Sequence, residues 1–251
     1  MCMNRTVANI DDSYQAVTAA LQDQVISDSD STPAAPADSS DSDAATATKS
    51  DWKLYNFCPN TSISSINDTD REARRLLNLK SYDILDSEKE AEFETITKEA
   101  ADYFKVPIVA ISLVDLGRQW FKSQVGLPVD ETPRDQSFCD HVVRRKEEVD
   151  PVMVVEDATK DERFRKNPLV TGGLNIRFYA GAPIESPEGE RLGAFCLIDN
   201  KNPRPQGLKE EEKKRLIDFA FEAAVNIVIR WVWITCAHTV RWWMSAIHFT
   251  T

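Results

Sequence analysis

Glycine and histidine are scarce in this chain, with 8 and 3 copies among 251 residues. The glycines form no phosphate-binding loop, and neither an HExxH zinc motif nor a GxSxG nucleophile motif occurs. His141 is the single histidine before residue 231, which argues against multi-histidine metal sites and imidazole-based triads in that part. The sequence therefore lacks the common signatures of phosphate-loop, zinc-hydrolase and serine-hydrolase chemistry.

Cysteines are also few, and their spacing is uninformative. There are five, an odd number, and no C-x-x-C pair occurs among Cys2, Cys58, Cys139, Cys196 and Cys236. This pattern is typical of reduced thiols in a cytosolic protein, not of a disulfide framework or a zinc site. The N-terminus has no basic segment followed by an apolar run, and Asp11 and Asp12 do not suit a transit peptide. We therefore predict a cytoplasmic protein.

Large apolar side chains are rare in the first fifty residues, which are rich in Ser, Thr, Ala and Asp. Eight acids against Arg5 and Lys49 give this stretch a charge of −6, more than half of the chain's −11. Such a composition buries too little apolar surface to offset the entropy of ordering. We predict a disordered acidic tail over 1–67 with a short helix at 11–26. The negative charge argues against nucleic acid as a partner.

Residues 68–230 alternate between helical and strand patterns. Thr69–Glu72 and Ser87–Glu90 each have the form of a capping box and predict a helix start. The second is followed by a core-facing stripe, namely Phe93, Ile96, Ala100 and Phe104.

The strand patterns that follow predict a sheet. Pro107–Val114 is apolar on both alternating faces, as in a central strand, and Arg118–Val125 is its expected hairpin partner. We further expect a helix at 138–145, a strand at 152–155, a hairpin at 176–199 and a last helix at 208–230. The sum is an α+β fold, with an antiparallel sheet of five to six strands flanked by helices.

The last twenty-one residues, 231–251, are crowded with tryptophan. A membrane-spanning helix needs about twenty apolar residues with few charges, whereas Arg230 and Arg241 bracket a shorter apolar stretch that also holds His238. We do not expect it to cross a membrane. Two other interpretations are a segment lying on a membrane surface and an aberrant end such as a mispredicted exon.

Several motifs, taken in order, resemble the GAF family of small sensory domains. They are Ser81–Asp86, Leu113–Asp115, Gln119–Ser123, Thr132–His141, Ile176–Pro183 and Leu192–Asp199. The resemblance covers roughly residues 70–229. It implies a GAF/PAS-like sheet with a ligand pocket on one face and helices on the other. It also implies a regulatory role, usually tethered to kinases, cyclases, phosphodiesterases or transcription regulators, so the signalling partner stays unidentified.

A pocket of that kind needs apolar walls with a few placed polar groups. The candidate ligand-binding residues are Trp120, Arg134, Asp135, Phe138, His141, Asp157, Arg163, Asn167, Arg177 and Tyr179, with Phe164 and Phe178 as further walls. An alternative interpretation is purely structural: Arg134 beside Asp135, and Asp157 before Arg163, would be salt bridges or caps that pin loops over the sheet.

The ligand class stays open. Family members that bind cyclic nucleotides carry motifs that Asn200–Lys201 and Glu210–Glu211 match in part, but Leu208 stands where an aromatic residue is expected. Bilin-binding members attach the chromophore to a Cys followed directly by His, whereas Cys139 and His141 are separated by Asp140. We therefore expect neither a covalent bilin nor a metal cofactor.

Some stand-alone GAF proteins reduce free methionine sulfoxide with cysteines, which makes Cys139 and Cys196 redox candidates. Cys196 also lies in an alternating apolar run, for which core packing is the default. We predict a non-catalytic small-molecule sensor, with a thiol reductase and a ligand-free dimerisation module as alternatives. A ligand would bias loops 133–141 and 157–177, and through them the terminal helices 69–79 and 208–230, which in this family often pair in homodimers.

Overall fold

The computed structural model describes residues 66–145 and 150–247. The chain divides into two compact units, Met1–Leu77 and Asn78–Thr251, and of the first unit only residues 66–77 are described. Residues 1–65 of the predicted disordered tail 1–67 and the short helix at 11–26 therefore lie outside the described residues, as do residues 248–251, whereas Ile66 and Asn67 belong to a helix.

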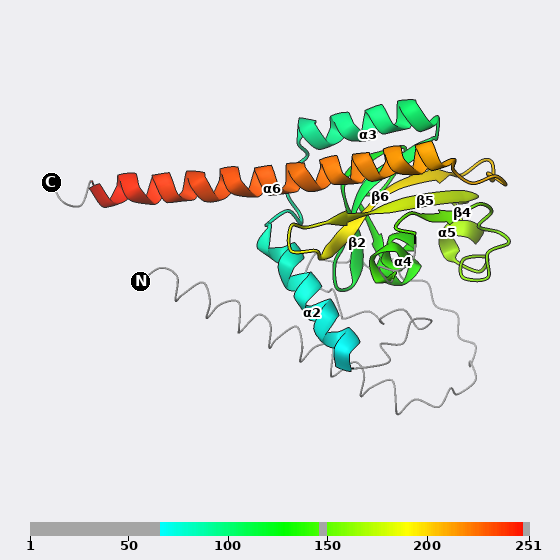
Figure 1. The fold of residues 1–251 in the computed structure, drawn as a ribbon, viewed down its shortest axis with the longest axis horizontal. Helices are drawn as coiled ribbons and strands as arrows, with labels where there is room; N and C mark the ends of the chain where they lie inside the picture. Colours follow the sequence, from blue (N-terminus) through cyan, green and yellow to red (C-terminus); the bar gives the residue numbers. More distant parts are fainter. Residues whose placement is uncertain (1–65, 146–149, 248–251) are drawn as a thin grey trace, which may run out of the picture. The chain divides into compact units, whose positions relative to one another are not determined.

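Helices and strands alternate along the described chain (Figure 1). In order they are α2 Ile66–Ser81, α3 Ala91–Phe104, β1 Ile108–Val114, β2 Arg118–Val125, β3 Glu131–Pro133, the 3₁₀ turn η1 Arg134–Gln136, α4 Phe138–Arg144, β4 Met153–Val155, α5 Pro168–Thr171, β5 Phe178–Glu185, β6 Arg191–Asp199 and α6 Glu210–Ile247.

The strands form one six-stranded sheet in the order β3-β2-β1-β6-β5-β4. Every paired neighbour is antiparallel. All residues of β1 and β6 are buried, since both strands lie in the interior of the sheet and are covered on both faces. The predicted α+β fold with a five- to six-stranded antiparallel sheet is confirmed.

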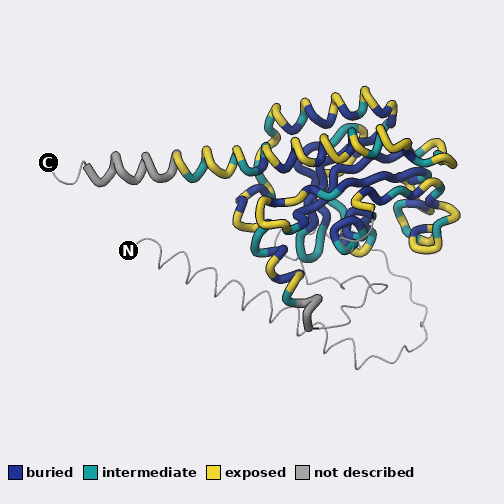
Figure 2. The backbone as a smooth tube through the Cα atoms, in the orientation of Figure 1, coloured by how far each residue is buried: buried dark blue, intermediate teal, exposed yellow. Residues whose placement is uncertain are grey.

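Each face of the sheet has its own apolar cluster. On one face, α3 and α6 lie side by side and pack with alternate strand residues around Phe93, Phe195 and Phe219 (Figure 1). On the other face, α4 and the segment 158–176 enclose a second cluster around Phe138, Phe164 and Tyr179. The sheet therefore separates a long-helix face from a loop-rich face, and Figure 2 shows its strands buried between them.

Both predicted capping boxes are wrong, although the core stripe of α3 is confirmed. Helix α2 already begins at Ile66, so Thr69 lies within it and is not its N-cap. Helix α3 has Glu90 as its N-cap, without a side-chain capping bond. The Ser87 hydroxyl instead donates to the Ile84 carbonyl and accepts from Lys122. A tertiary partner has thus taken the side chain that the local motif assigned to the helix end.

Helix α6 extends well beyond the predicted end at residue 230, to Ile247. Its first half carries the predicted core face, with Leu216, Ala220, Ala223 and Ile227 all buried. By length and composition alone, the stretch Glu210–Cys236 could also cross a bilayer, but part of its apolar character belongs to this core face. The sequence patterns missed the short β3 and α5, although Asn167 before Pro168 is a typical helix start.

Strands β1 and β6 approach so closely at Gly193 that a side chain there would overlap the Ser112 carbonyl. We expect Gly193→Ala to lower the free energy of unfolding by roughly 2–3 kcal/mol, because backbone cannot yield as a flexible side chain would. Gly117→Ala is the matched control, since no atom lies within 4 Å of a Cβ at that turn. Urea denaturation of both variants measures the difference, and equal stabilities would contradict this account.

Candidate functional site

Three buried aromatic rings lie in a row between the sheet and the loops of the loop-rich face. Tyr179 on β5 is fully buried, and its ring lies 5.1 Å from that of Phe138 on α4. Phe138 in turn stacks on Phe164, with centroids 3.9 Å apart and an interplanar angle of 12°. We call Tyr179, Phe138 and Phe164 the aromatic column. It joins the two loops, 133–141 and 157–177, that the sequence predicted to respond to a ligand.

Two ionisable side chains lie at the outer end of the column. The His141 ring meets Phe164 edge-on at 4.8 Å, and the Arg163 guanidinium lies 4.9 Å from the same ring. Arg163 also forms an ion pair with Asp161 at 2.7 Å while 46% of its side chain stays exposed. Burial lowers the pKa of His141, an effect that Asp140 opposes and Arg163 and Arg144 reinforce. Hydrogen bonding from Arg163 lowers the pKa of Asp161, which keeps that carboxylate charged.

Two buried thiols lie at the inner end of the column. The Tyr179 hydroxyl donates to Cys139 Sγ at 3.2 Å, and Cys196 on β6 is fully buried. Hydrogen bonding to Cys139, together with burial, raises the pKa of Cys196 far above its usual value. Burial likewise raises the pKa of Tyr179. Both cysteines are free thiols sealed from solvent, so each is placed as a core side chain.

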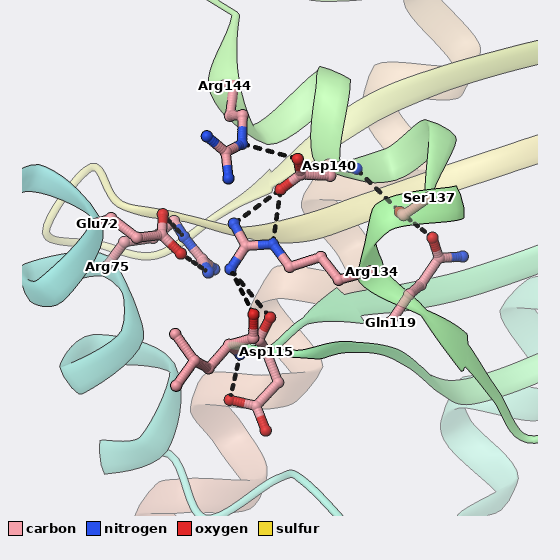
Figure 3. Close-up of polar contacts among 9 residues, drawn as sticks. Glu72, Arg75, Asp115, Gln119, Arg134, Ser137, Asp140 and Arg144 are labelled. Carbon is pink, nitrogen blue, oxygen red and sulfur yellow. Dashed lines mark hydrogen bonds and ion pairs between the residues drawn. The ribbon is translucent and has the colours of Figure 1, made fainter. Parts of the chain in front are cut away.

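A buried ion pair fixes the start of α4 next to the column (Figure 3). Arg134 Nε donates to Asp140 Oδ1 at 2.8 Å, while its Nη1 donates to the carbonyls of Asp115 and Leu116. Arg144 Nε reaches the other Asp140 oxygen at 2.7 Å. The turn between β1 and β2 is thereby tied to α4. Figure 3 also draws Glu72 and Arg75, which pair with each other within α2.

Hydrogen bonds within the loops involve three further candidates. Asn167 caps α5 by accepting from the Leu169 amide, and its Nδ2 donates to the Gln136 carbonyl at 3.0 Å. Arg177 Nη1 donates to the Val170 carbonyl at 3.2 Å. Asp157 accepts from the amide and hydroxyl of Thr159. These side chains hold the segment 157–177 in shape.

The structural interpretation paired Arg134 with Asp135 and Asp157 with Arg163. The structure has salt bridges at these residues, but with other partners. Arg134 pairs with Asp140, whereas Asp135 is exposed. Asp157 pairs with Lys160, and Arg163 pairs with Asp161. In each of these pairs the local fold brings a different carboxylate or cation into contact with the candidate side chain.

Phe178 packs in the cluster beneath α3 and α6, and Trp120 is a second candidate that the structure does not bring to the loop-rich face. It packs in the cluster beneath α3 and α6, while its neighbour Phe121 points to the loop-rich face. Asp140 is the residue that the sequence interpretation missed. Two features of the sequence could have pointed to Asp140. Ser137 is the N-cap whose hydroxyl accepts from the Asp140 amide, and Arg144 follows Asp140 at the i+4 position.

Within the described ranges 66–145 and 150–247, no group of three or more His, Cys, Asp or Glu side chains is arranged to hold a metal ion. The chemistry available at this face is therefore stacking on the column, together with hydrogen bonding and charge at its outer rim.

The lowered pKa of His141 predicts how the stability of the fold changes with pH. The unfolded chain titrates near the ordinary value of 6.5, so below that pH it binds a proton that the folded state resists. The contribution of His141 to stability is thus lost as the pH falls from 6.5 through the folded pKa. We expect His141→Gln to flatten the dependence of the unfolding free energy between pH 7 and 5, measured by denaturation at each pH. If the unfolding free energy of His141→Gln depends on pH as steeply as that of the wild-type chain, this result would count against the burial of the imidazole.

The chain was compared with known proteins. Residues 88–227 match the GAF domain. A segment of 128 residues is 45% identical to a cyclic di-GMP phosphodiesterase of Pseudomonas aeruginosa, covering 51% of this chain and 21% of that protein. The chain thus spans about a fifth of the length of this relative.

Two solved structures are similar in fold at low sequence identity. The GAF domain of an Acinetobacter phosphoenolpyruvate-protein phosphotransferase is 20% identical, with a TM-score of 0.45, covering 65% of this chain and 94% of that one. A free methionine-R-sulfoxide reductase from Thermoplasma acidophilum is 13% identical, with a TM-score of 0.44, covering 55% and 90%. The match over residues 88–227 and the antiparallel sheet between two helical layers lead to one assignment: this chain belongs to the GAF domain family.

Proposed function

We propose that this GAF domain, a sensing or regulatory module by family, acts as a non-catalytic sensor of a small planar molecule. The observation that carries the proposal is the aromatic column. It begins on the sheet, ends near the surface where two loops meet, and has a cation and an imidazole at its outer end. Stacking surfaces of this kind bind planar rings, and a charged rim orients their polar substituents.

Phe164 occupies the outermost place in the column. It belongs to the segment 157–167, which is joined to the start of α4 by the bond from Asn167 to the Gln136 carbonyl. A planar ligand that stacks on Phe138 would take the place of the Phe164 ring and so move this segment. Binding and loop displacement are then one event, which is what a population shift between two states of a sensor requires.

The burial of the thiols favours sensing over the reductase alternative. A reductase needs a thiolate that its substrate can reach. Cys139 and Cys196 are both within 1% of complete burial. Against the opposing effect of burial, hydrogen bonds with Cys196 and Tyr179 lower the pKa of Cys139, whereas hydrogen bonding to Cys139 and burial raise the pKa of Cys196. The support for sensing therefore comes from the inaccessibility of both thiols and not from their pKa values. The activity of the Pseudomonas relative belongs to a protein about five times the length of the shared segment.

The ligand proposal is tested on the full-length chain by native mass spectrometry after gentle purification. Titrations with cyclic di-GMP, cyclic GMP and methionine sulfoxide follow. We expect a bound species of a few hundred daltons, or saturable binding of one of the two cyclic nucleotides, whereas binding of methionine sulfoxide would favour the reductase alternative. Phe138→Leu should weaken that binding about tenfold, because it removes the ring on which the ligand stacks while keeping an apolar side chain.

The matched control is Phe104→Leu, which changes an equally buried ring on the opposite face. Binding that survives Phe138→Leu unchanged, or that Phe104→Leu weakens equally, would overturn this placement of the site. A chain that binds none of the titrants and carries no co-purified molecule would overturn the sensing proposal itself.

A second candidate, a homodimer formed through α6, is favoured by a stripe of exposed apolar residues on that helix. They recur every fourth position, namely Ile217, Phe221, Val225, Ile229 and Trp233. Residues four apart share a helix face, so the stripe is continuous. Phe221 and Trp233 are 70% and 72% exposed. We propose that a second copy of this chain covers the stripe.

We expect the full-length chain to be dimeric and the double variant Phe221→Glu/Val225→Glu to be monomeric, because four buried charges would face one another in the paired helices. Light scattering after size-exclusion chromatography gives the mass. Glu222→Gln is the control, since it changes a neighbouring exposed position off the stripe. A monomeric wild-type chain, or a double variant that stays dimeric, would refute the pairing.

A further inference from the structure

Lys122 is a fully buried lysine at an irregularity of the sheet. Where β1 pairs with β2, Ile111 lies opposite Ser123 and Ser112 lies opposite Phe121, so Lys122 is the extra residue of a β-bulge. The bulge lets the side chain reach the loop before α3. Its Nζ donates to Ser87 Oγ at 2.8 Å and to the Glu88 carbonyl at 2.6 Å. Bulges often re-aim side chains at functional positions.

Glu90 completes the shell around this ammonium group. Its Oε2 lies 3.1 Å from Lys122 Nζ, and 0% of the Lys122 side chain is exposed. The Lys122 cation also lies 5.0 Å from the Phe93 ring. The charge of a sheet residue is therefore balanced by a single carboxylate at the N-terminus of α3.

The second oxygen of Glu90 binds α6. Arg230 Nε donates to Glu90 Oε1 at 2.9 Å, and Arg230 Nη1 donates to the Asp83 carbonyl at 2.8 Å. One carboxylate thus joins two cations, one from the sheet and one from the long helix. The two cations bind opposite oxygens of the same carboxylate. Displacement of Lys122 therefore changes the position of Glu90 and the negative charge that Arg230 contacts.

Arg230 lies at the point where α6 leaves its core contacts. Ile227 is 1% exposed, whereas Trp231 and Val232 are 38% and 44% exposed. Figure 2 shows the same change along α6, from buried to mainly exposed. The ion pair with Glu90 is consequently an anchor at the boundary between the packed and the projecting parts of the helix.

We propose that Lys122, Glu90 and Arg230 form a relay that sets how firmly α6 is held at residue 230. Lys122 follows Phe121, whose ring packs in the cluster of the loop-rich face, so a change in that cluster alters the bulge. The shared carboxylate carries the change through the sheet to α6. The relay rests on the proposed sensing function only for its trigger, because the contacts themselves require no ligand.

The relay is tested by hydrogen–deuterium exchange on the full-length chain without any ligand. We expect Glu90→Gln to speed exchange in peptides covering residues 225–236 about tenfold, because it weakens the ion pair that anchors the helix at the edge of the core. Lys122→Met should have a similar effect on the same peptides, although Lys122 lies on β2. The double variant should add nothing further, since both changes break one path.

Glu94→Gln is the matched control on α3, where Glu94 pairs only at the surface with Lys98 at 3.6 Å. It should leave the α6 peptides unchanged. Thermal melting of each variant checks folding. If Glu90→Gln fails to fold, Arg230→Gln removes the same ion pair from the α6 side. Unchanged α6 exchange in Lys122→Met, or effects that add in the double variant, would overturn the relay. A failed ligand titration would leave this result untouched.

Discussion

The burial of the central strands on both faces is the constraint from which the other features follow. Strands β1 and β6 expose nothing to solvent, so every polar side chain that enters from their neighbours must find a partner inside the protein. Each face has at least one buried cation that meets this demand with a carboxylate partner. Arg134 pairs with Asp140 beneath the loop-rich face, and Lys122 pairs with Glu90 beneath α3. An unpaired charge at either place would cost several kcal/mol.

These two pairs connect elements that lie far apart in the sequence. Arg134 joins the β1–β2 turn to α4, whereas Glu90 joins β2 to α6. Strand β2 therefore contacts both polar networks, and a displacement of its bulge is felt on both faces of the sheet. Such contiguous packing and hydrogen bonding is the kind of connection through which two sites can be coupled.

The sequence predicted the features that depend on local periodicity. The stripe of α3, the continuous apolar run of β1 and the hairpin of β5 and β6 are each determined by residues close together in the chain. Features that depend on distant partners were not predictable. Ser87 failed as a helix cap because Lys122, thirty-five positions away, takes its hydroxyl. Trp120 was assigned to the wrong face because Trp120 and Phe121 are adjacent aromatic residues on opposite sides of β2, and the sequence does not reveal which side bears the loops.

The same closure that argues against catalysis suits a sensor. Tyr179, Cys139 and Cys196 are sealed by Phe138 and Phe164, so any reaction at the thiols would first require the loops to open. For an enzyme that opening is a cost paid in every turnover. For a sensor it is the signal, because a ligand that stabilises the open loops shifts the population by its preference for that state. A closed aromatic column, tied by the sheet to a helix that projects from the core, therefore favours regulation over chemistry.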